Sequence, residues 1–314
     1  MAGPKPVVVV GSINTDLVSV AERIPHVGET VLGSDFRIHP GGKGANQAVA
    51  VARLGYPVRM IGRVGTDSFG REARLHLEAS GVDTECVGTS EGASGIAVIC
   101  VSAKGENSII VTPGANWNVG PADMERYLPV IRGAGIVLAQ LEIPIESIEY
   151  LAQMCAREGI PFVLDPAPAR ELPKEIFKHI AWFTPNQSEA IFFTHGARNG
   201  ESFDVQAVAR ELLLKGNHGV VLKRGEEGAL VACSNGSVTA VPAFRVTAID
   251  TTAAGDAFNG GFAVGLMKGM KPAQSAQFAA AVAGVSVTRR GAQPSMPTLN
   301  EVEQFIAEHA ERVV

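Results

Sequence analysis

Helical segments and short apolar strands alternate between residues 121 and 165, and this alternation is the feature that most restricts the fold. The pattern predicts a helix over Pro121–Ile131, a strand over Ile136–Gln140, a helix over Ile145–Arg157 and a strand over Pro161–Asp165. Segments that alternate in this way form right-handed βαβ units. We therefore expect an α/β fold in which a doubly wound, mostly parallel central sheet is flanked by helices. No repeat of fixed period and no low-complexity linker divides the 314 residues, so one domain over 1–314 is predicted.

Polar side chains follow the first predicted strand. Val7–Gly11 reads as a buried β-branched strand, and Ser12, Asn14 and Asp16 come directly after it. Ligands of open α/β sheets bind beyond the carboxyl ends of the strands. A carboxylate accepts from two hydroxyls and an amide both donates and accepts, so Asn14 and Asp16 suit neighbouring hydroxyls of a sugar. The alternative is a local turn, which both residue types favour.

Two β-rich patches precede the regular alternation, at about residues 15–40 and 95–113. Their short strands are punctuated by turn residues, which predicts a small sheet outside the main one. A pair of surface hairpins is the alternative.

Small residues lead into a predicted helix in A-I-D-T-T-A-A-G-D-A-F-N-G-G, residues 248–261. Backbone N–H groups at a helix start have no partner inside the helix, and the macrodipole adds positive charge, so they suit a phosphate. Asp256 would repel that anion unless a metal or a transferred proton offsets its charge. This points to phosphoryl transfer with Asp256 accepting a proton from an attacking hydroxyl. Considered alone, however, the stretch is better explained as an ordinary capped helix start.

A second glycine-rich cluster, P-G-G-K-G-A-N-Q at residues 40–47, predicts a turn whose backbone can touch a ligand. Lys43 supplies one cation and Asn46 one amide. Gly44 follows the lysine where a phosphate-binding P-loop requires Ser or Thr. Gln47 stands where a dinucleotide fingerprint requires its third glycine, so neither of these motifs is present.

Composition excludes several classes of function. With 46% hydrophobic and 19% charged residues the chain can bury a large core, and its formal net charge of −5 argues against nucleic acid as a partner. No apolar run is long enough to span a membrane. The four cysteines are isolated from one another and from metal-ligand spacings, which is typical of free thiols in a reducing cytoplasm.

The two clusters together resemble the signatures of the PfkB carbohydrate kinase family. The similarity rests on G-G-K-G-A-N-Q-A-V-A followed by Leu54-Gly55, and on D-T-T-A-A-G-D near the C-terminus, and it extends from about Val8 to Ser295. The resemblance implies ATP-dependent transfer of a phosphoryl group to the 5-hydroxyl of ribose, with Mg²⁺ on the phosphates and K⁺ as an activating cation. It also implies that the small sheet is a lid over the sugar and pairs with the lid of a second subunit.

The resemblance also implies roles for individual residues. Asp256 would be the base, and the backbone amides of Ala253, Ala254, Gly255 and Asp256 would hold the transferring oxygens. The implied sugar ligands are Asn14, Asp16, Gly42, Lys43, Asn46, Glu142 and Asp256.

The nucleotide side is expected downstream. Asn186 and Glu189 have the spacing of a capping box, which is the structural reading; the family carries an N-x-x-E motif here, so Glu189 would reach Mg²⁺ through water. Lys223 stands where many relatives have Thr. The implied nucleotide contacts are Asn186, Glu189, Lys223, Gly225, Gly228, Ala254, Gly255 and Ala280. The implied potassium ligands are oxygens of Asp250, Thr252, Ser286, Arg289, Gly291 and Ser295.

Three alternatives remain at this stage. A kinase of the same family for deoxyribose, a fructose-type sugar or adenosine would differ at the sugar contacts. A non-catalytic sugar-binding protein has no need of Asp256. An NAD-dependent oxidoreductase is disfavoured because only Gly11 follows the first strand.

Overall fold

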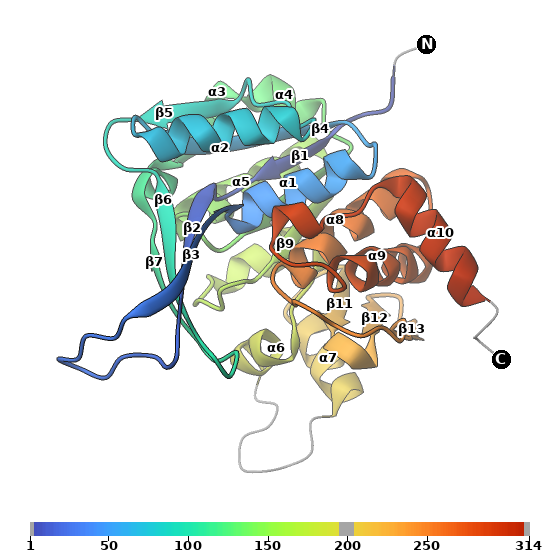
Figure 1. Ribbon diagram of the computed structural model, residues 1–314. Coiled ribbons are helices and arrows are strands. Elements are labelled where there is room, and N and C mark those ends of the chain that lie inside the picture. Colours follow the sequence, from blue (N-terminus) through green and yellow to red (C-terminus); the bar gives the residue numbers. More distant parts are fainter. Residues whose placement is uncertain (1–2, 195–203, 311–314) are drawn as a thin grey trace.

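The computed structural model describes residues 3–194 and 204–310, and its strands form two sheets (Figure 1). The strands are β1 Val7–Val10, β2 Asn14–Ala21, β3 Gly33–Gly41, β4 Val58–Gly65, β5 Val87–Ser90, β6 Gly95–Ser102, β7 Asn107–Thr112, β8 Ile136–Gln140, β9 Phe162–Asp165, β10 Trp182–Phe183, β11 Gly219–Lys223, β12 Ala229–Cys233 and β13 Val238–Val241. The central sheet has the order β13-β12-β11-β10-β9-β8-β1-β4-β5. Within this sheet, neighbouring strands are parallel from β5 to β11, and β12 and β13 extend the sheet as an antiparallel hairpin.

Ten helices belong to the described part of the chain. They are α1 Lys43–Arg53, α2 Ser68–Ala79, α3 Pro121–Arg126, α4 Leu128–Arg132, α5 Ile145–Glu158, α6 Gln187–Phe193, α7 Val205–Leu213, α8 Ala254–Met267, α9 Pro272–Ser286 and α10 Leu299–Ala310, with short 3-10 turns η1 Gly114–Asn118, η2 Lys174–His179, η3 Gly225–Glu227 and η4 Gln293–Ser295. None of them is long and apolar enough to cross a membrane.

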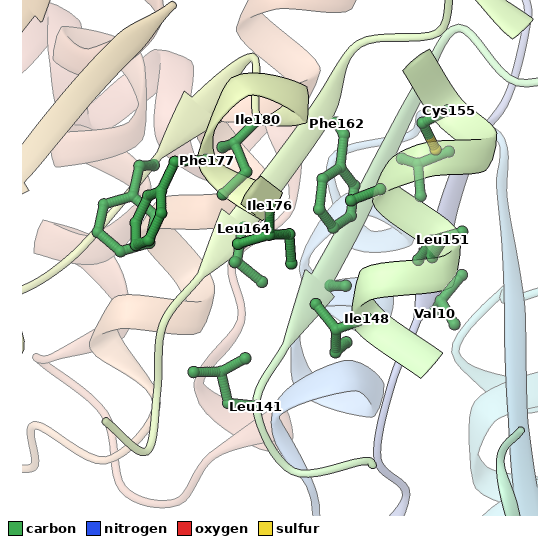
Figure 2. Packing of buried hydrophobic residues seen from close by; sticks show 14 of the residues in the cluster. Val10, Leu141, Ile148, Leu151, Cys155, Phe162, Leu164, Ile176, Phe177 and Ile180 are labelled. Carbon is green, nitrogen blue, oxygen red and sulfur yellow. The ribbon is translucent and has the colours of Figure 1, made fainter. Parts of the chain in front are cut away.

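Hydrophobic clusters cover both faces of the central sheet. Val8 and Val10 of β1 face a cluster with α3 to α7, whereas Val7 and Val9 face a second cluster with α1, α2, α8, α9 and α10. Figure 2 shows the first cluster, in which Ile148, Leu151 and Cys155 of α5 lie over the sheet. Both sides of β1 are therefore buried, which explains its unbroken run of valines. The predicted doubly wound α/β fold is confirmed.

The smaller sheet has the order β3-β2-β6-β7 and extends along one side of the molecule (Figure 1). Strand β2 pairs with β3 and β6, antiparallel and parallel respectively, and β6 pairs antiparallel with β7. The second sheet expected from the two β-rich patches is therefore present.

One expectation about the elements was wrong, and one hairpin was missed. Pro121–Ile131 is not one helix, because α3 ends at Arg126 and α4 begins at Leu128. Pro129 lacks the N–H for a bond to the carbonyl of Glu125 and its ring crowds that carbonyl, so the helix cannot run through. The hairpin β12-β13 was not predicted.

The order of the central strands reverses beside β1. The chain proceeds from β1 to β4 and β5 on one side, and then returns to β8, β9, β10 and β11 on the other. The loops that leave β1 and β8 diverge at this switch point, and ligands of open α/β sheets bind there.

Candidate active site

Residues after β1 and β8 meet at the switch point. The Ser12 hydroxyl donates to Oε2 of Glu142 at 2.5 Å, and the backbone N–H of Lys43 donates to the same oxygen at 3.1 Å. Asp16 lies nearby: burial first, and then the charge of Glu142, raise the pKa of Asp16 to about 6. The structure therefore brings three predicted segments of the sugar site together.

The orientation of Asn14 is fixed by Asn116, a buried residue that the sequence analysis missed. Oδ1 of Asn116 accepts from the N–H of Ile13 at 2.9 Å, and its Nδ2 donates to Oδ1 of Asn14 at 2.6 Å. The Nδ2 group of Asn14 has no partner within the described residues. Asn14 therefore offers a hydrogen-bond donor to a ligand.

The glycine-rich cluster at residues 40–47, called the glycine-lysine turn from here on, lies at the start of α1, as predicted. Gly42 has a φ of 88°, and a Cβ atom there would lie 2.6 Å from the backbone nitrogen of Asn14. Gly44 approaches the backbone of Gly11 and Ser12 so closely that its Cβ would lie 2.7 Å from Ser12 N. These glycines let α1 begin directly against the end of β1.

Asp256 is buried in the first turn of α8, where two amides of α1 hold its carboxylate. Asn46 Nδ2 donates to Oδ2 at 2.9 Å, and Gln47 Nε2 donates to Oδ1 at 3.0 Å. Burial raises the pKa of Asp256 to about 6; the charge of Asp165 adds to this, whereas Lys43 and the two amides oppose it. Such a carboxylate can take a proton near neutral pH.

An anion cradle adjoins this carboxylate. The N–H groups of Ala253, Gly255 and Asp256 have no hydrogen-bond partner among the described residues, whereas that of Ala254 donates to Thr251 O at 3.2 Å. The cradle therefore offers fewer free amides than the sequence predicted. Ala253 adopts a left-handed conformation with φ of 58°, which no other non-glycine residue does within residues 3–194 and 204–310. Strain of this kind is found where a backbone is shaped for a ligand.

Two lysines reach the same region. Lys223 Nζ forms an ion pair with Asp165 Oδ1 at 2.9 Å, and it would lie 3.4 Å from a Cβ atom placed on Gly255. Lys43 lies among carboxylates: burial acts to lower its pKa, but the charges of Asp256 and Asp165 outweigh burial and raise the pKa of Lys43. Lys43 is therefore held in its charged form, and Lys223 lies close to the cradle.

An open depression of about 600 Å³ continues from Lys223 to the start of α6. It is lined by Asn186, Gln187, Ser188, Ile191, Lys223, Arg224, Gly225, Glu226 and Glu227. A Cβ atom on Gly225 would meet nothing within 4 Å, so this glycine borders open space. Gly228 does not line this depression, and its Cβ would lie 2.1 Å from Val241 O, so chain packing already requires glycine at this position. Ala280 does not line this depression and packs beside the cluster that contains Phe258 and Phe262.

The predicted capping box at Asn186 is present. Glu189 accepts from the N–H of Asn186 at 2.7 Å and from its Nδ2 at 2.8 Å, so both carboxylate oxygens already have donors. Burial, with a smaller contribution from Asp165, raises the pKa of Glu189. Each oxygen keeps one lone pair, which fits a carboxylate that meets a hydrated ion through water. No group of three or more His, Cys, Asp or Glu residues suited to a metal occurs in the part of the chain that the structure describes.

The segments expected to hold a monovalent cation lie side by side. Asp250 accepts from the N–H of Thr252 at 2.9 Å and from the N–H of Gly291 at 2.8 Å. The hydroxyls of Ser286 and Ser295 are 2.7 Å apart. The side chain of Arg289 points elsewhere, to Glu301, which leaves only its carbonyl for an ion. The set is rich in oxygen, the ligand type that potassium takes.

Sequence reasoning missed Gln47 and Asp165 as parts of the site. Asp165 ends β9 and pairs with Gln140 of β8. Its position at the carboxyl end of a predicted strand was a usable signal, because Asn14, Asp16 and Glu142 were found in that way. Gln47 gave no comparable signal, since a glutamine inside a helix is usually a solvated residue.

Comparison with known proteins identifies the relatives of this chain. The sequence profile of the pfkB family of carbohydrate kinases matches residues 5–299. The ribokinase of Bacillus subtilis is 40% identical over 300 residues, which cover 95% of this chain and 98% of that protein. A deoxyribokinase of Salmonella typhi is 35% identical, covering 96% of this chain and 98% of that protein. The structure of Arabidopsis thaliana ribokinase with ribose and ATP superposes with a TM-score of 0.88 at 33% identity, covering 97% of this chain and 99% of that chain.

Proposed function

The chain belongs to the pfkB carbohydrate kinase family, and from this premise we propose that it is an ATP-dependent kinase that converts D-ribose to D-ribose 5-phosphate. The similarity to ribokinases over nearly the whole chain supports ribose and ATP as substrates. The observation that carries the proposal is the meeting of the Asp256 carboxylate, free backbone amides and the glycine-lysine turn at one point. Asp256 is the proton acceptor, the free amides form the anion cradle, and the glycine-lysine turn lies at the edge that binds the sugar hydroxyls.

The reaction follows from the places of these groups. The 5-oxygen of ribose bonds to the γ-phosphorus while the bond from that phosphorus to the β,γ-bridging oxygen breaks, and ADP leaves. The hydroxyl proton passes to Asp256. The free amides of Gly255 and Asp256, with Lys223 beside them, stabilise the charge on the transferring oxygens. A loose transition state makes proton removal late, so positioning contributes more than basicity.

The sugar is held at the switch point between β1 and β8. Asn14 donates through Nδ2, Asp16 accepts, and Glu142 is fixed by Ser12 and by the N–H of Lys43. One donor and several acceptor oxygens suit adjacent hydroxyls. Gly42, Lys43 and Asn46 complete the sugar side of the site.

The charge of the site supports a requirement for metal ions. The carboxylates Asp16, Glu142, Asp165, Asp256 and Glu189 outnumber Lys43 and Lys223, and a bound ATP adds further negative charge. Mg²⁺ would neutralise the phosphates, with Glu189 holding one of its waters. The oxygens of Asp250, Thr252, Ser286, Arg289, Gly291 and Ser295 would hold K⁺, which adds positive field beside the cradle.

We also propose that the smaller sheet acts as a lid and pairs with a second copy of the chain in a homodimer. It exposes large apolar side chains, including Phe36 at 59%, Ile109 at 51% and Ile110 at 67%. These side chains lie on the two edge strands of the smaller sheet, β3 and β7. Exposed large apolar groups gathered on one small sheet indicate a surface that is covered in the working protein. Four free cysteines suit a reducing cytoplasm as its location.

The test is a substrate panel. The purified chain is incubated with ATP, Mg²⁺ and K⁺ and with D-ribose, 2-deoxy-D-ribose, D-fructose or adenosine, and ADP release is followed against a blank without acceptor. Ribose is expected to give the highest kcat/KM, and phosphorus-proton coupling should locate the phosphate on the 5-carbon. ADP release with ribose no faster than the blank would refute the proposal.

Deoxyribose is the second candidate, because the deoxyribokinase of Salmonella typhi is 35% identical over a similar length. The site favours ribose, because Asn14 and Asp16 can each hydrogen-bond to a hydroxyl group. 2-Deoxyribose has one hydroxyl fewer and would leave one of these bonds unmade. A higher kcat/KM for 2-deoxyribose in the same panel would reverse this order.

A further inference from the structure

Buried polar side chains form one chain of hydrogen bonds behind the reacting groups. Gln140 Nε2 donates to Gln47 Oε1 at 2.7 Å. Gln47 Nε2 in turn donates to Oδ2 of Asp165 at 3.0 Å and to Oδ1 of Asp256 at 3.0 Å. Gln47 and Gln140 are 0% exposed. Solvent therefore cannot supply any donor or acceptor that this chain of bonds lacks.

The direction of these bonds follows from chemistry. Two carboxylates face the end of the Gln47 side chain, and carboxylates only accept, so that end must be the NH₂ group. Its two hydrogens serve the two carboxylates. The carbonyl of Gln47 then faces Gln140, which must donate. A reversed Gln47 amide would set its oxygen against both carboxylates.

The same nitrogen separates two like charges. Asp165 is one of the groups that raise the pKa of Asp256, and Gln47 is one of the groups that lower it. Lys43 and Asn46 of α1 also face Asp256, and Asp16 of β2, with Glu142 behind it, lies on the sugar side. Within this set, Gln47 is the group that bonds both Asp256 and Asp165.

Asp165 carries the connection to the anion cradle. Its other oxygen pairs with Lys223 Nζ at 2.9 Å, and that ammonium group lies close to Gly255. The order Asp256, Gln47, Asp165, Lys223 therefore runs from the proton acceptor to the cation at the phosphate.

We propose that Gln47 is a positioning residue for phosphoryl transfer, whose amide nitrogen joins the base Asp256 to Asp165 and, through Asp165, to Lys223 at the anion cradle. The proposal rests on the proposed kinase function. Without the Gln47 amide, Asp256 and Asp165 face each other with no donor between them, and the proton affinity of Asp256 rises. Without the charge of Asp165, the proton affinity of Asp256 falls.

The test uses the opposite effects that loss of Gln47 and loss of Asp165 should have on the proton affinity of Asp256. The pH dependence of kcat is measured at saturating ribose and ATP for the wild type, Gln47→Met and Asp165→Asn. At saturation, kcat reports the titration of groups in the substrate complex, where the sugar is bound to Asp16. The acid limb, which is the fall of kcat toward low pH, therefore reports the protonation of Asp256. Loss of one charge-assisted hydrogen bond corresponds to about one pH unit. We expect the limb to move up by about that amount in Gln47→Met and down in Asp165→Asn.

Asn217→Leu is the matched control, because Asn217 is a buried amide near the start of β11 that contacts neither carboxylate. Its acid limb is expected at the wild-type pH. A general loss of packing cannot move the limbs of Gln47→Met and Asp165→Asn in opposite directions.

The outcomes separate the two proposals. A wild type that phosphorylates ribose, with acid limbs unchanged in both variants, would overturn the role of Gln47 alone. Limbs that move in the same direction would also overturn it. If Gln47→Met does not fold, Gln47→Asn takes its place, because its shorter side chain cannot bring one nitrogen to both carboxylates and the same upward shift is expected. A wild type inactive on ribose would refute the kinase function and the role of Gln47 with it.

Discussion

Replacement of Asp256 by Asn should abolish turnover without damaging the fold. The variant keeps the shape of the side chain but removes the proton acceptor, and loss of a general base lowers kcat by about 10² to 10⁴. Ribose also contacts Asn14, Asp16 and Glu142 in the proposed complex, so its KM should change far less than kcat. The effect on stability distinguishes this account from a simple loss of structure.

The sign of the stability effect follows from the pKa. Burial raises the pKa of Asp256 from 3.8 to about 6, so the folded chain binds this proton more tightly than the unfolded chain does. The stability that the protonated group contributes is complete below the unfolded pKa and is lost as the pH rises through the folded pKa. Above both values the buried carboxylate lowers the free energy of unfolding by about 3 kcal/mol, since each pKa unit corresponds to about 1.4 kcal/mol.

Asn removes that penalty but introduces a smaller one. Its NH₂ group must face a donor, either Nδ2 of Asn46 or Nε2 of Gln47, at a loss of about 1 to 2 kcal/mol. We therefore expect the free energy of unfolding at neutral pH to rise by about 1 to 2 kcal/mol, which raises Tm by about 4 °C at most.

The assay pairs steady-state kinetics with thermal unfolding at neutral pH. Asp123→Asn is the control, since Asp123 is also a buried carboxylate but pairs with Arg63 at 2.7 Å. The control should lower Tm and leave kcat unchanged. Wild-type-like turnover in Asp256→Asn would refute its role as the base, and a Tm several degrees below wild type would refute the reasoning on burial.

Three further predictions test other parts of the site. Ribose binding should weaken as the pH falls through about 6, because burial and Glu142 raise the pKa of Asp16 to about 6 and protonation removes an acceptor. Calorimetric titration should show this dependence in the wild type and a weaker one in Asp16→Asn, where Asp256 remains as a titrating sugar contact. Lys223→Met should raise the KM for ATP and lower kcat, so that kcat/KM falls by about tenfold, which corresponds to the loss of one charge-assisted hydrogen bond. Lys223→Arg should keep part of the activity. Gly42→Ala should lose about 2 kcal/mol more stability in denaturant unfolding than Gly236→Ala, because both have positive φ but only Gly42 has a neighbouring backbone within 3 Å; equal losses would show that the close approach is unimportant.

Local features of the site could be predicted from the sequence. The valine run of β1 indicated a strand buried on both faces, and the glycines before Lys43 indicated a turn at a helix start. The Asn186 and Glu189 spacing indicated a capping box, which α6 has. Each signal lies within a few residues, and the backbone rules that govern it act at that range.

The connections between segments could not be predicted in the same way. Gln47 bonds to Asp165 and Asp256, which lie 118 and 209 positions away along the chain. Nothing in the helical pattern of α1 distinguishes this buried amide from a solvated one. The roles of Gly228 and Ala280 were similarly out of reach, because they depend on which neighbour fills the space beside each residue.

The small residues of α8 connect the packing of the fold to its chemistry. A Cβ atom on Gly260 would lie 2.6 Å from Ala50 Cβ of α1, and one on Gly261 would lie 3.0 Å from the Cα of Ala279 in α9. Larger side chains at either position would force α8 away from its neighbours. Asp256 lies one turn before Gly260, and its amide partners stand on α1 one turn before Ala50. The close contact of α1 and α8 therefore sets the distance between the base and the amides that hold it, and the glycines on this face of α8 are what permit that contact.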